Sequence, residues 1–468
     1  MKKLQALALA ALLAGGIFAD SPKPSPRLQR LAKGLPAVGQ IADFKSLGIE
    51  LQATNKPPGV AAQTATSYKI YFPTDLDRKS TDDSPYKGKY PGVHLNIPLQ
   101  VRPSYINYLF ISDQPERILD TRKRTPAEAP GSAQPGPGAT GIYARSPIPG
   151  KSTVRVLVDH TNGTQRPLRF DLVWLPTKQG FLTVRKRSLS VHKDSVAAGS
   201  RAFGDMAEVV VEPRQGLQPD TSCTLISQRL EPEETVVLHQ EFFSSSPGTL
   251  AAVVSEVEQS APGQLAQLDQ LPVLHSIVWK EEEERLGKFI DKGKDPTRWN
   301  RIMDAFQHAR GHFPSPDRSA EVVYNVTSWA EAESPMRTYS KFESIPGVDV
   351  TVKKGQQPAT TDNRGKYGAR VGIQWKIGGL PPGCKEVAIV AINRGAVFGG
   401  RHWVSDGRRT VFEVFHRPGT SPGLLKQNCA STLWKGPVGV GDQIQMWTEP
   451  MANTSVQLWY LLVPLPPS

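Results

Sequence analysis

The stretch STVRVLVDHTNGTQRPLRFDLVWLPTKQGFLTVRKRSLSVH (152–192) decides the fold. It holds three runs rich in β-branched, aromatic and other apolar residues, separated by short segments that contain Gly, Pro, Asn and Thr. Such runs indicate neighbouring strands joined by turns. Runs of the same composition recur in YINYLFIS (105–112), TVVLHQEFF (235–243) and TLAAVVSEV (249–257). We therefore predict that this part of the chain is an all-β sandwich.

A second β-rich block begins near Ser319. Its strand candidates include AEVVYNVTSWA (320–330), YGARVGIQWKI (367–377), KEVAIVAINR (385–394) and SVQLWYLLVPL (455–465). Strands at this spacing predict a second sandwich. The fold class predicted for the whole chain is mainly all-β, with two β-sandwich domains joined by a partly helical linker.

The 468 residues are enough for two or three domains of ordinary size. We predict a first β-sandwich domain at 67–257, a partly helical linker at 258–318 and a second β-sandwich domain at 319–468. The linker is expected to be partly helical because RWNRIMDAFQHA (298–309) has apolar residues at helical spacing. The segment PAEAPGSAQPGPGATG (126–141) is a Pro/Gly-rich insert in the first domain, expected to be an exposed loop.

The N-terminal segment predicts export. Lys2 and Lys3 precede an uncharged run rich in Leu and Ala that extends to Ala19, which is typical of a signal peptide. The run is shorter than the roughly 20 apolar residues of a membrane span. We interpret residues 1–19 as a signal peptide and 20–66 as a flexible lead-in. The mature chain is expected in the periplasm, at the cell surface or outside the cell, without a transmembrane segment.

The chain is basic, with a formal net charge of +12, which favours anionic partners in general. The densest basic runs are Arg122-Lys123-Arg124 and Arg185-Lys186-Arg187. Neither run carries the aromatic–basic pattern of an RNA-binding sheet. We therefore expect no nucleic-acid partner and interpret most of the charge as a solvated surface.

The chain has three cysteines. Cys384 and Cys429 fall in the same predicted domain and are the candidate disulfide in an oxidising compartment. Cys223 is then a lone thiol. Three dispersed cysteines do not predict a zinc site.

Motif strings for catalysis do not meet their structural requirements. The string GTSPG (419–423) fits G-x-S-x-G, but prolines flank the serine where a helix would have to start. His308 and His312 have the i, i+4 spacing of helical metal ligands, but Gly311 and Pro314 end the helix there. We assign no catalytic residue, metal ligand or cofactor.

Two tryptophans near Gly-rich loops, Trp403 and Trp434, are candidates for stacking on sugar rings, with packing as the competing interpretation. Trp375 and Trp459 lie within apolar runs and are expected in the core.

Several short motifs resemble a known family. The chain has a D-x-P-E element, a G-I-Y segment and a strand that ends in H-x-N, followed by HARGHFP (308–314) and, further on, INRGAVFGG (392–400). This order is similar to that of an uncharacterised group of secreted bacterial proteins, often found with a copper-amine-oxidase-like stalk domain at the N-terminus. The matching residues of the first three motifs are Asp113, Pro115, Glu116, Gly141, Ile142, Tyr143, Arg155, Leu157, His160 and Asn162.

The resemblance spans about residues 105–405 and implies an envelope-associated β protein without established catalysis. No stalk domain is recognisable, and nothing resembles the tyrosine cofactor or copper ligands of an amine oxidase. The motifs around His308, Arg310 and Arg394 suggest a joint ligand site. Alternatively, the two arginines hold loops in place by donating hydrogen bonds to carbonyl groups.

These observations leave three hypotheses. The first is a secreted, non-enzymatic structural or interaction module of the cell envelope, whose partner is an envelope glycan or another envelope protein. The second is a carbohydrate- or anionic-polymer-binding module. The third is an exported hydrolase, which a pocket that unites His160 or His308 with a hydroxyl or thiol and a carboxylate would favour.

Overall fold

The structure is a computed structural model of the whole chain. It describes the following residues: 23–43, 69–71, 94–96, 100–101, 105–113, 117–118, 140–204, 212–257, 265–272, 310–332, 337–339, 345–351, 358–363, 367–393, 397–407, 411–416, 423–426, 429–451 and 458–467. The predicted signal peptide, most of the Pro/Gly-rich insert and the predicted helix at 298–309 lie outside these residues.

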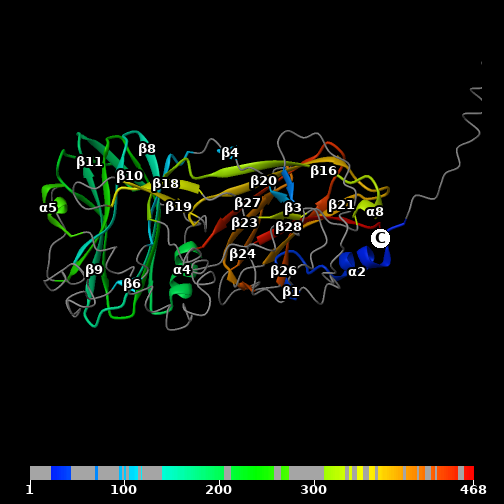
Figure 1. Ribbon diagram of the computed structural model, residues 1–468, viewed down its shortest axis with the longest axis horizontal. Coiled ribbons are helices and arrows are strands. Elements are labelled where there is room, and N and C mark those ends of the chain that lie inside the picture. The colour runs from blue at the N-terminus through cyan, green and yellow to red at the C-terminus, as the bar shows by residue number, and fades with distance from the viewer. Residues whose placement is uncertain are drawn as a thin grey trace, which may run out of the picture.

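The first sandwich packs a nine-stranded sheet against a four-stranded sheet (Figure 1). The nine-stranded sheet has the order β11 (Gln215–Leu217), β10 (Gly180–His192), β13 (Thr235–Ser244), β8 (Ser152–Asn162), β5 (Tyr108–Ser112), β15 (Arg310–Pro314), β18 (Ile345–Asp349) and β19 (Ala359–Asn363), and β6 (Arg117–Ile118) also pairs with β8. The four-stranded sheet has the order β12 (Cys223–Leu230), β9 (Leu168–Pro176), β14 (Gly248–Glu256) and β7 (Gly141–Ile148).

The second sandwich packs a seven-stranded sheet against a six-stranded sheet. The seven-stranded sheet has the order β1 (Ile41–Asp43), β26 (Cys429–Pro437), β21 (Glu386–Asn393), β28 (Leu458–Leu465), β17 (Arg337–Tyr339), β3 (His94–Asn96) and β2 (Lys69–Tyr71). The six-stranded sheet has the order β24 (Val411–His416), β23 (Gly400–Ser405), β27 (Gln443–Pro450), β20 (Val371–Gly379), β16 (Arg318–Asn325) and β4 (Gln100–Val101). A separate pair joins β22 (Val397–Phe398) to β25 (Leu425–Lys426).

The described helices are short: α2 (Pro26–Gly34), α4 (Ser195–Gly204), α5 (Leu265–Gln270) and α8 (Trp329–Ala332). In α2, the side chain of Ser25 accepts a hydrogen bond from the Leu28 amide, which caps the helix N-terminus. Leu28 and Leu31 then pack against the second core. None of these described helices combines the length and the apolar character that crossing a membrane requires.

Alternation along each strand builds the cores. On β8, Val154, Val156 and Val158 face the four-stranded sheet, where they meet residues such as Phe170 and Trp174. The second core is built in the same way from the facing strands of its two sheets, with Trp375 and Trp434 among its largest buried side chains. The structure thus confirms the predicted all-β, sandwich-type fold.

The sheets do not follow the predicted residue boundaries. Strand β15 lies within the predicted linker, yet it pairs with β5 in the nine-stranded sheet. Strands β18 and β19 come from the second predicted domain and join the same sheet. Conversely, β3 comes from the first predicted domain and pairs with β17 of the second sandwich. These long-range pairings leave no local signature, because each strand shows only its own alternation.

The chain consequently passes between the sandwiches several times. Within the described residues it crosses from β4 to β5, from β15 to β16, from β17 to β18 and from β19 to β20. Figure 1 shows the two sandwiches side by side along the long axis, with β18 and β19 near the boundary between them. The contact between the sandwiches is therefore made by interleaved strands and their connections.

Candidate functional site: a buried ionic junction between the sandwiches

The junction is centred on Arg155, on the outer face of β8. Because side chains alternate along a strand, Arg155 points away from the core that Val154 and Val156 enter. The second sandwich covers this outer face, so the Arg155 side chain has no solvent exposure. A buried arginine requires carboxylate partners and hydrogen-bond acceptors to offset its desolvation.

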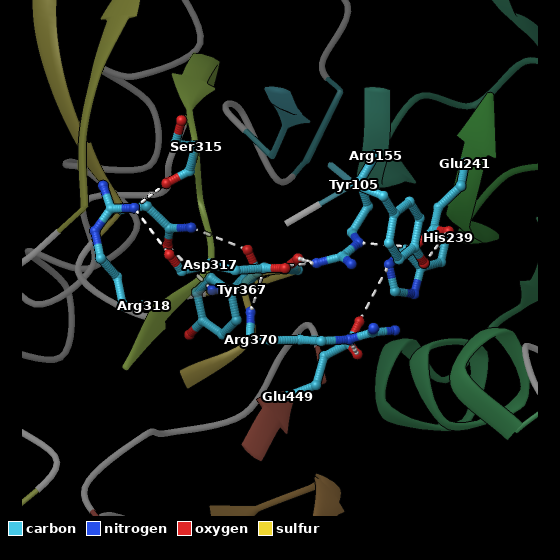
Figure 2. A network of polar contacts seen from close by, with 12 residues as sticks. Tyr105, Arg155, His239, Glu241, Ser315, Asp317, Arg318, Tyr367, Arg370 and Glu449 are labelled. Carbon is cyan, nitrogen blue, oxygen red and sulfur yellow. Dashed lines mark hydrogen bonds and ion pairs between the residues drawn. The ribbon is translucent and has the colours of Figure 1, made fainter. Parts of the chain in front are cut away.

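Arg155 has partners from both sandwiches (Figure 2). Its Nε donates to Glu241 Oε1 on the neighbouring strand β13 at 3.0 Å. Its Nη1 donates to Asp317 Oδ1 at 3.1 Å and to the carbonyl oxygen of Gly368 at 2.8 Å. Asp317 directly precedes β16, and Gly368 lies in the turn before β20. One guanidinium group therefore links the first sandwich to the two segments that lead into β16 and β20 of the second.

A second ion pair lies beside the first. Arg370 Nε donates to Glu449 Oε2 at 2.9 Å, and the Glu449 side chain is only 3% exposed. The Arg370 amide also donates to Asp317 Oδ1 at 3.1 Å. Asp317 thus accepts hydrogen bonds from Arg155 and from the Arg370 backbone, which links the two ion pairs into one cluster.

His239 and Tyr105 complete the cluster. His239 Nε2 lies 3.5 Å from Glu449 Oε1, and the Tyr105 hydroxyl donates to Glu241 Oε2 at 2.8 Å. Burial lowers the pKa of His239 to about 4, so its imidazole is neutral at pH 7. Burial alone would raise the pKa of Glu449, but Arg370 and Arg155 outweigh it and hold that pKa far below its usual range.

Apolar packing surrounds the ionic cluster. Leu109 and Leu157 on the outer face of the first sheet pack with Phe203 of α4 and with Met451, which follows β27. Arg401 of β23 donates to the carbonyl oxygen of Phe203. The junction therefore combines a hydrophobic contact with a charged interior, whereas the core of a subunit interface is usually depleted of charged residues.

The chain crosses between the sandwiches at the centre of this site. Only residues 315–317 separate β15 from β16, and Ser315 has a positive φ of 45°. The Arg318 guanidinium donates to the carbonyl oxygens of Ser315 and Asp317, which fixes the crossing and positions the Asp317 side chain. Figure 2 shows this crossing next to the ionic cluster.

The structure places the predicted sugar-binding tryptophans differently. Trp434 is 1% exposed and belongs to the second core, so its assignment as a sugar-stacking residue is wrong. Trp403 on β23 is half-buried, and the Arg370 guanidinium lies over its ring at 5.4 Å from the centroid. Trp403 therefore packs beside the junction and is not an open platform.

Arg310 is also buried, at 1% exposure. It pairs with Asp349 and donates to the carbonyl oxygens of Tyr143 and Thr351, so it fastens β15 to β18 and β7. This confirms the interpretation that Arg310 holds loops through carbonyl groups and speaks against its role as a ligand contact. The remaining members of the suggested joint site, His308 and Arg394, lie outside the described residues.

The candidate disulfide between Cys384 and Cys429 is contradicted, because both are free thiols in the structure. Cys384 precedes the start of β21, whereas Cys429 starts β26, which runs antiparallel beside β21. In that register the two cysteines lie at opposite ends of the strand pair, roughly 25 Å apart at about 3.3 Å per residue. A disulfide requires Cα atoms within about 7 Å.

We expect all three thiols of the purified chain to react with a thiol reagent after denaturation without reductant. Burial raises the pKa of Cys223 to about 11, so slow labelling of this thiol is expected in the folded state. Electrospray mass after alkylation counts the modified residues. A count of one, restored to three by prior reduction, would establish a disulfide and contradict the structure.

His160 does meet a hydroxyl group. Its Nε2 lies 2.8 Å from Ser112 Oγ, the pairing that a serine hydrolase uses. Both side chains have 0% exposure, and the rings of Tyr143 and Phe170 flank the imidazole inside the first sandwich. This environment gives a polar contact within the core and no access for a substrate. Among the described residues, no group of three or more metal-ligating side chains is placed to hold a metal ion.

The residues of the junction were missed by the sequence analysis. His239 and Glu241 are polar residues two positions apart in the apolar run TVVLHQEFF, so they share its outward face. Arg155 and Asp159 likewise share the outward face of the run STVRVLVDH. Charged residues on the outward face of a strand are also typical of a solvated sheet, so this pattern alone did not identify a buried junction.

The fold and the junction define a class: an all-β protein of two interleaved sandwiches with a buried ionic contact. No family model matches the chain, and no curated protein matches its sequence. Solved structures that align with it include the CBM22-1-CBM22-2 tandem domain from Paenibacillus barcinonensis Xyn10C, with 8% identity, 66% of this chain and 83% of that chain covered, and a TM-score of 0.15.

Oxalate decarboxylase from Bacillus subtilis aligns with 9% identity over 69% of this chain and 75% of its own, with a TM-score of 0.11. Vicilin from Capsicum annuum aligns with 9% identity over 64% and 72%, with a TM-score of 0.09. TM-scores this low carry no argument about fold or function, so the functional conclusion depends on the chain's own residues.

Proposed function

We propose that the chain is an exported, non-enzymatic module of the cell envelope that acts as a structural or interaction protein. The observation that supports the proposal is the buried ionic junction. Across the two sandwiches, Arg155 pairs with Asp317, and His239 lies 3.5 Å from Glu449. Perturbed pKa values often mark catalytic sites, but here they belong to groups that fasten two domains into one body.

A hydrolase is the main competing function, and the Ser112–His160 pair is its most specific candidate. The complete burial of that pair supports the non-enzymatic proposal. The expected basic surface and the interleaved sandwiches fit a protein that presents a fixed surface to a partner, because a rigid arrangement lowers the entropic cost of binding.

The test combines localisation and activity. The full chain with a C-terminal tag is expressed in a bacterial host, and osmotic-shock and envelope fractions are probed, with N-terminal sequencing of the product. We expect an exported product that begins near Asp20 and that chemical crosslinking in the native cells joins to envelope material. Retention of the uncleaved chain in the cytoplasm would contradict export.

For the activity arm, the purified chain is incubated with ester, glycoside and peptide substrates, alongside Ser112→Ala. We expect no turnover that depends on Ser112. Hydrolysis that Ser112→Ala abolishes, with unchanged thermal unfolding, would overturn the non-enzymatic proposal and favour the exported hydrolase.

A further inference from the structure

Two neighbouring aromatic rings with a cation at each end form a row on the outer face of the nine-stranded sheet, beyond the junction. The Arg214 guanidinium lies 4.5 Å from the Phe181 ring centroid, and the Phe181 and Phe243 rings are 5.8 Å apart. The Arg185 guanidinium lies 5.4 Å from the Phe243 centroid. We call these four residues the cation–aromatic ladder.

The ladder comes from three strand segments that the sheet brings together. Phe181 and Arg185 lie on β10, Phe243 lies on β13, and Arg214 directly precedes β11. The basic run at 185–187 contains no aromatic residue. Phe181 lies earlier on the same strand, and the adjacent strand β13 supplies Phe243.

A β-bulge sets the direction of the cations. The register of β10 and β13 shifts between Val184 and Lys186, so Arg185 and Lys186 together face Glu241. A bulge breaks strict alternation and re-aims a side chain. Lys186 Nζ lies 4.0 Å from Glu241 Oε2, whereas Arg185 Nη1 donates to Thr153 Oγ1 at 3.4 Å.

The ladder keeps its positive charge. Among the described residues, neither Arg185 nor Arg214 has a carboxylate partner within salt-bridge distance. Arg214 is exposed, and the other three members of the ladder are half-buried. A guanidinium group held over an aromatic ring keeps its planar edge available for the forked hydrogen bonds that match a carboxylate.

We propose that the cation–aromatic ladder is a binding site for an acidic polysaccharide, with its two guanidinium groups engaging successive carboxylates of the polymer. The charge at both ends of the ladder fits a repeating polyanion better than a single small anion. The guanidinium groups already occupy faces of Phe181 and Phe243, which leaves less open ring surface than base stacking requires. This favours an acidic sugar chain over a single-stranded nucleic acid.

This inference deepens the proposed function. It rests on that function only for the location, because an acidic polysaccharide would meet the chain at the cell envelope. The test itself uses the purified full chain and polygalacturonate as the probe, with fully methyl-esterified polygalacturonate as the neutral form of the same backbone. Binding is followed by biolayer interferometry at low and moderate salt. Its failure leaves the export and activity results intact.

The informative variant is Arg185→Gln with Arg214→Gln, and the matched control is Arg166→Gln with Arg229→Gln. The control removes the same charge from two arginines of the first sandwich that are 57% and 59% exposed. We expect the ladder variant to weaken binding to polygalacturonate about tenfold or more and the control to change it less than about threefold. The esterified polymer is expected not to bind.

Three results would overturn the proposal: no binding to polygalacturonate, an equal loss of binding in both variants, or tighter binding of single-stranded DNA through the same arginines. Thermal unfolding of both variants accompanies the binding measurement. The substituted side chains are at least partly exposed, so we expect both variants to unfold within a few degrees of the unmodified chain.

Discussion

Arg155→Met is expected to destabilise the protein by about 3–5 kcal/mol. The substitution keeps most of the apolar stem but leaves Glu241 and Asp317 without their shared cation. These carboxylates are 1% and 7% exposed, so water cannot replace the lost interaction. Urea denaturation, followed by tryptophan fluorescence and by circular dichroism, measures the change.

The matched control is Arg229→Met, which makes the same substitution on the same sandwich. Arg229 Nε donates to Glu231 Oε1 at 2.7 Å, but the two side chains are 59% and 47% exposed. Exposed pairs contribute little, so we expect a loss of less than about 1 kcal/mol. Equal effects of the two substitutions would show that the junction pair contributes no more than a surface pair.

Acidification from pH 7 to pH 4 is expected to remove about 3 kcal/mol of stability for each of His239 and His416. Burial lowers the pKa of each imidazole from the ordinary 6.5 to about 4. Between pH 6.5 and about pH 4 only the unfolded chain takes up these protons. The contribution of the neutral histidines to the unfolding free energy is therefore fully present above pH 6.5 and falls until about pH 4. Burial also lowers the pKa of His402, with the same sign.

The charged groups around His239 fix the interpretation of this pH dependence. Glu449 and Glu241 favour its protonation, and Arg155 and Arg370 oppose it. The pKa of Glu449 is itself depressed, so its contribution is lost at still lower pH, after the histidines. Both effects destabilise the folded state as the pH falls.

His239→Gln separates the junction from the other histidines. We expect this variant to show a shallower dependence of the unfolding free energy on pH between 6.5 and 4 than the unmodified chain. Urea denaturation at half-unit pH steps gives the slopes. Equal stability at pH 7 and pH 4.5 in the unmodified chain would contradict the neutral, buried state of these imidazoles.

Alternation in the strands was sufficient to predict the fold class. In STVRVLVDH the valines face one side and Arg155 the other, and this is their arrangement on β8. The same pattern could not show that a second sandwich covers Arg155. Alternation reports which side of a sheet a residue faces, and only long-range pairings such as β5 with β15 determine what lies on that side.

The site residues were harder to predict for a related reason. The positions of Trp434 near glycines and of Arg310 in a short motif predict binding residues, but both side chains are buried. Large aromatic and cationic side chains serve packing and loop attachment as readily as binding. The cation–aromatic ladder was missed because Phe243 and Arg185 come from different strands and meet only through the sheet register.

Differential scanning calorimetry at pH 7 tests most directly whether the buried ionic junction makes the two sandwiches one body. We expect a single transition for the unmodified chain, with equal calorimetric and van't Hoff enthalpies, because the junction couples the sandwiches. We also expect Arg155→Met to lower the transition temperature or to split the transition in two, whereas Arg229→Met leaves a single transition. Two separate transitions in the unmodified chain would contradict the account, because the sandwiches would then unfold independently despite the junction.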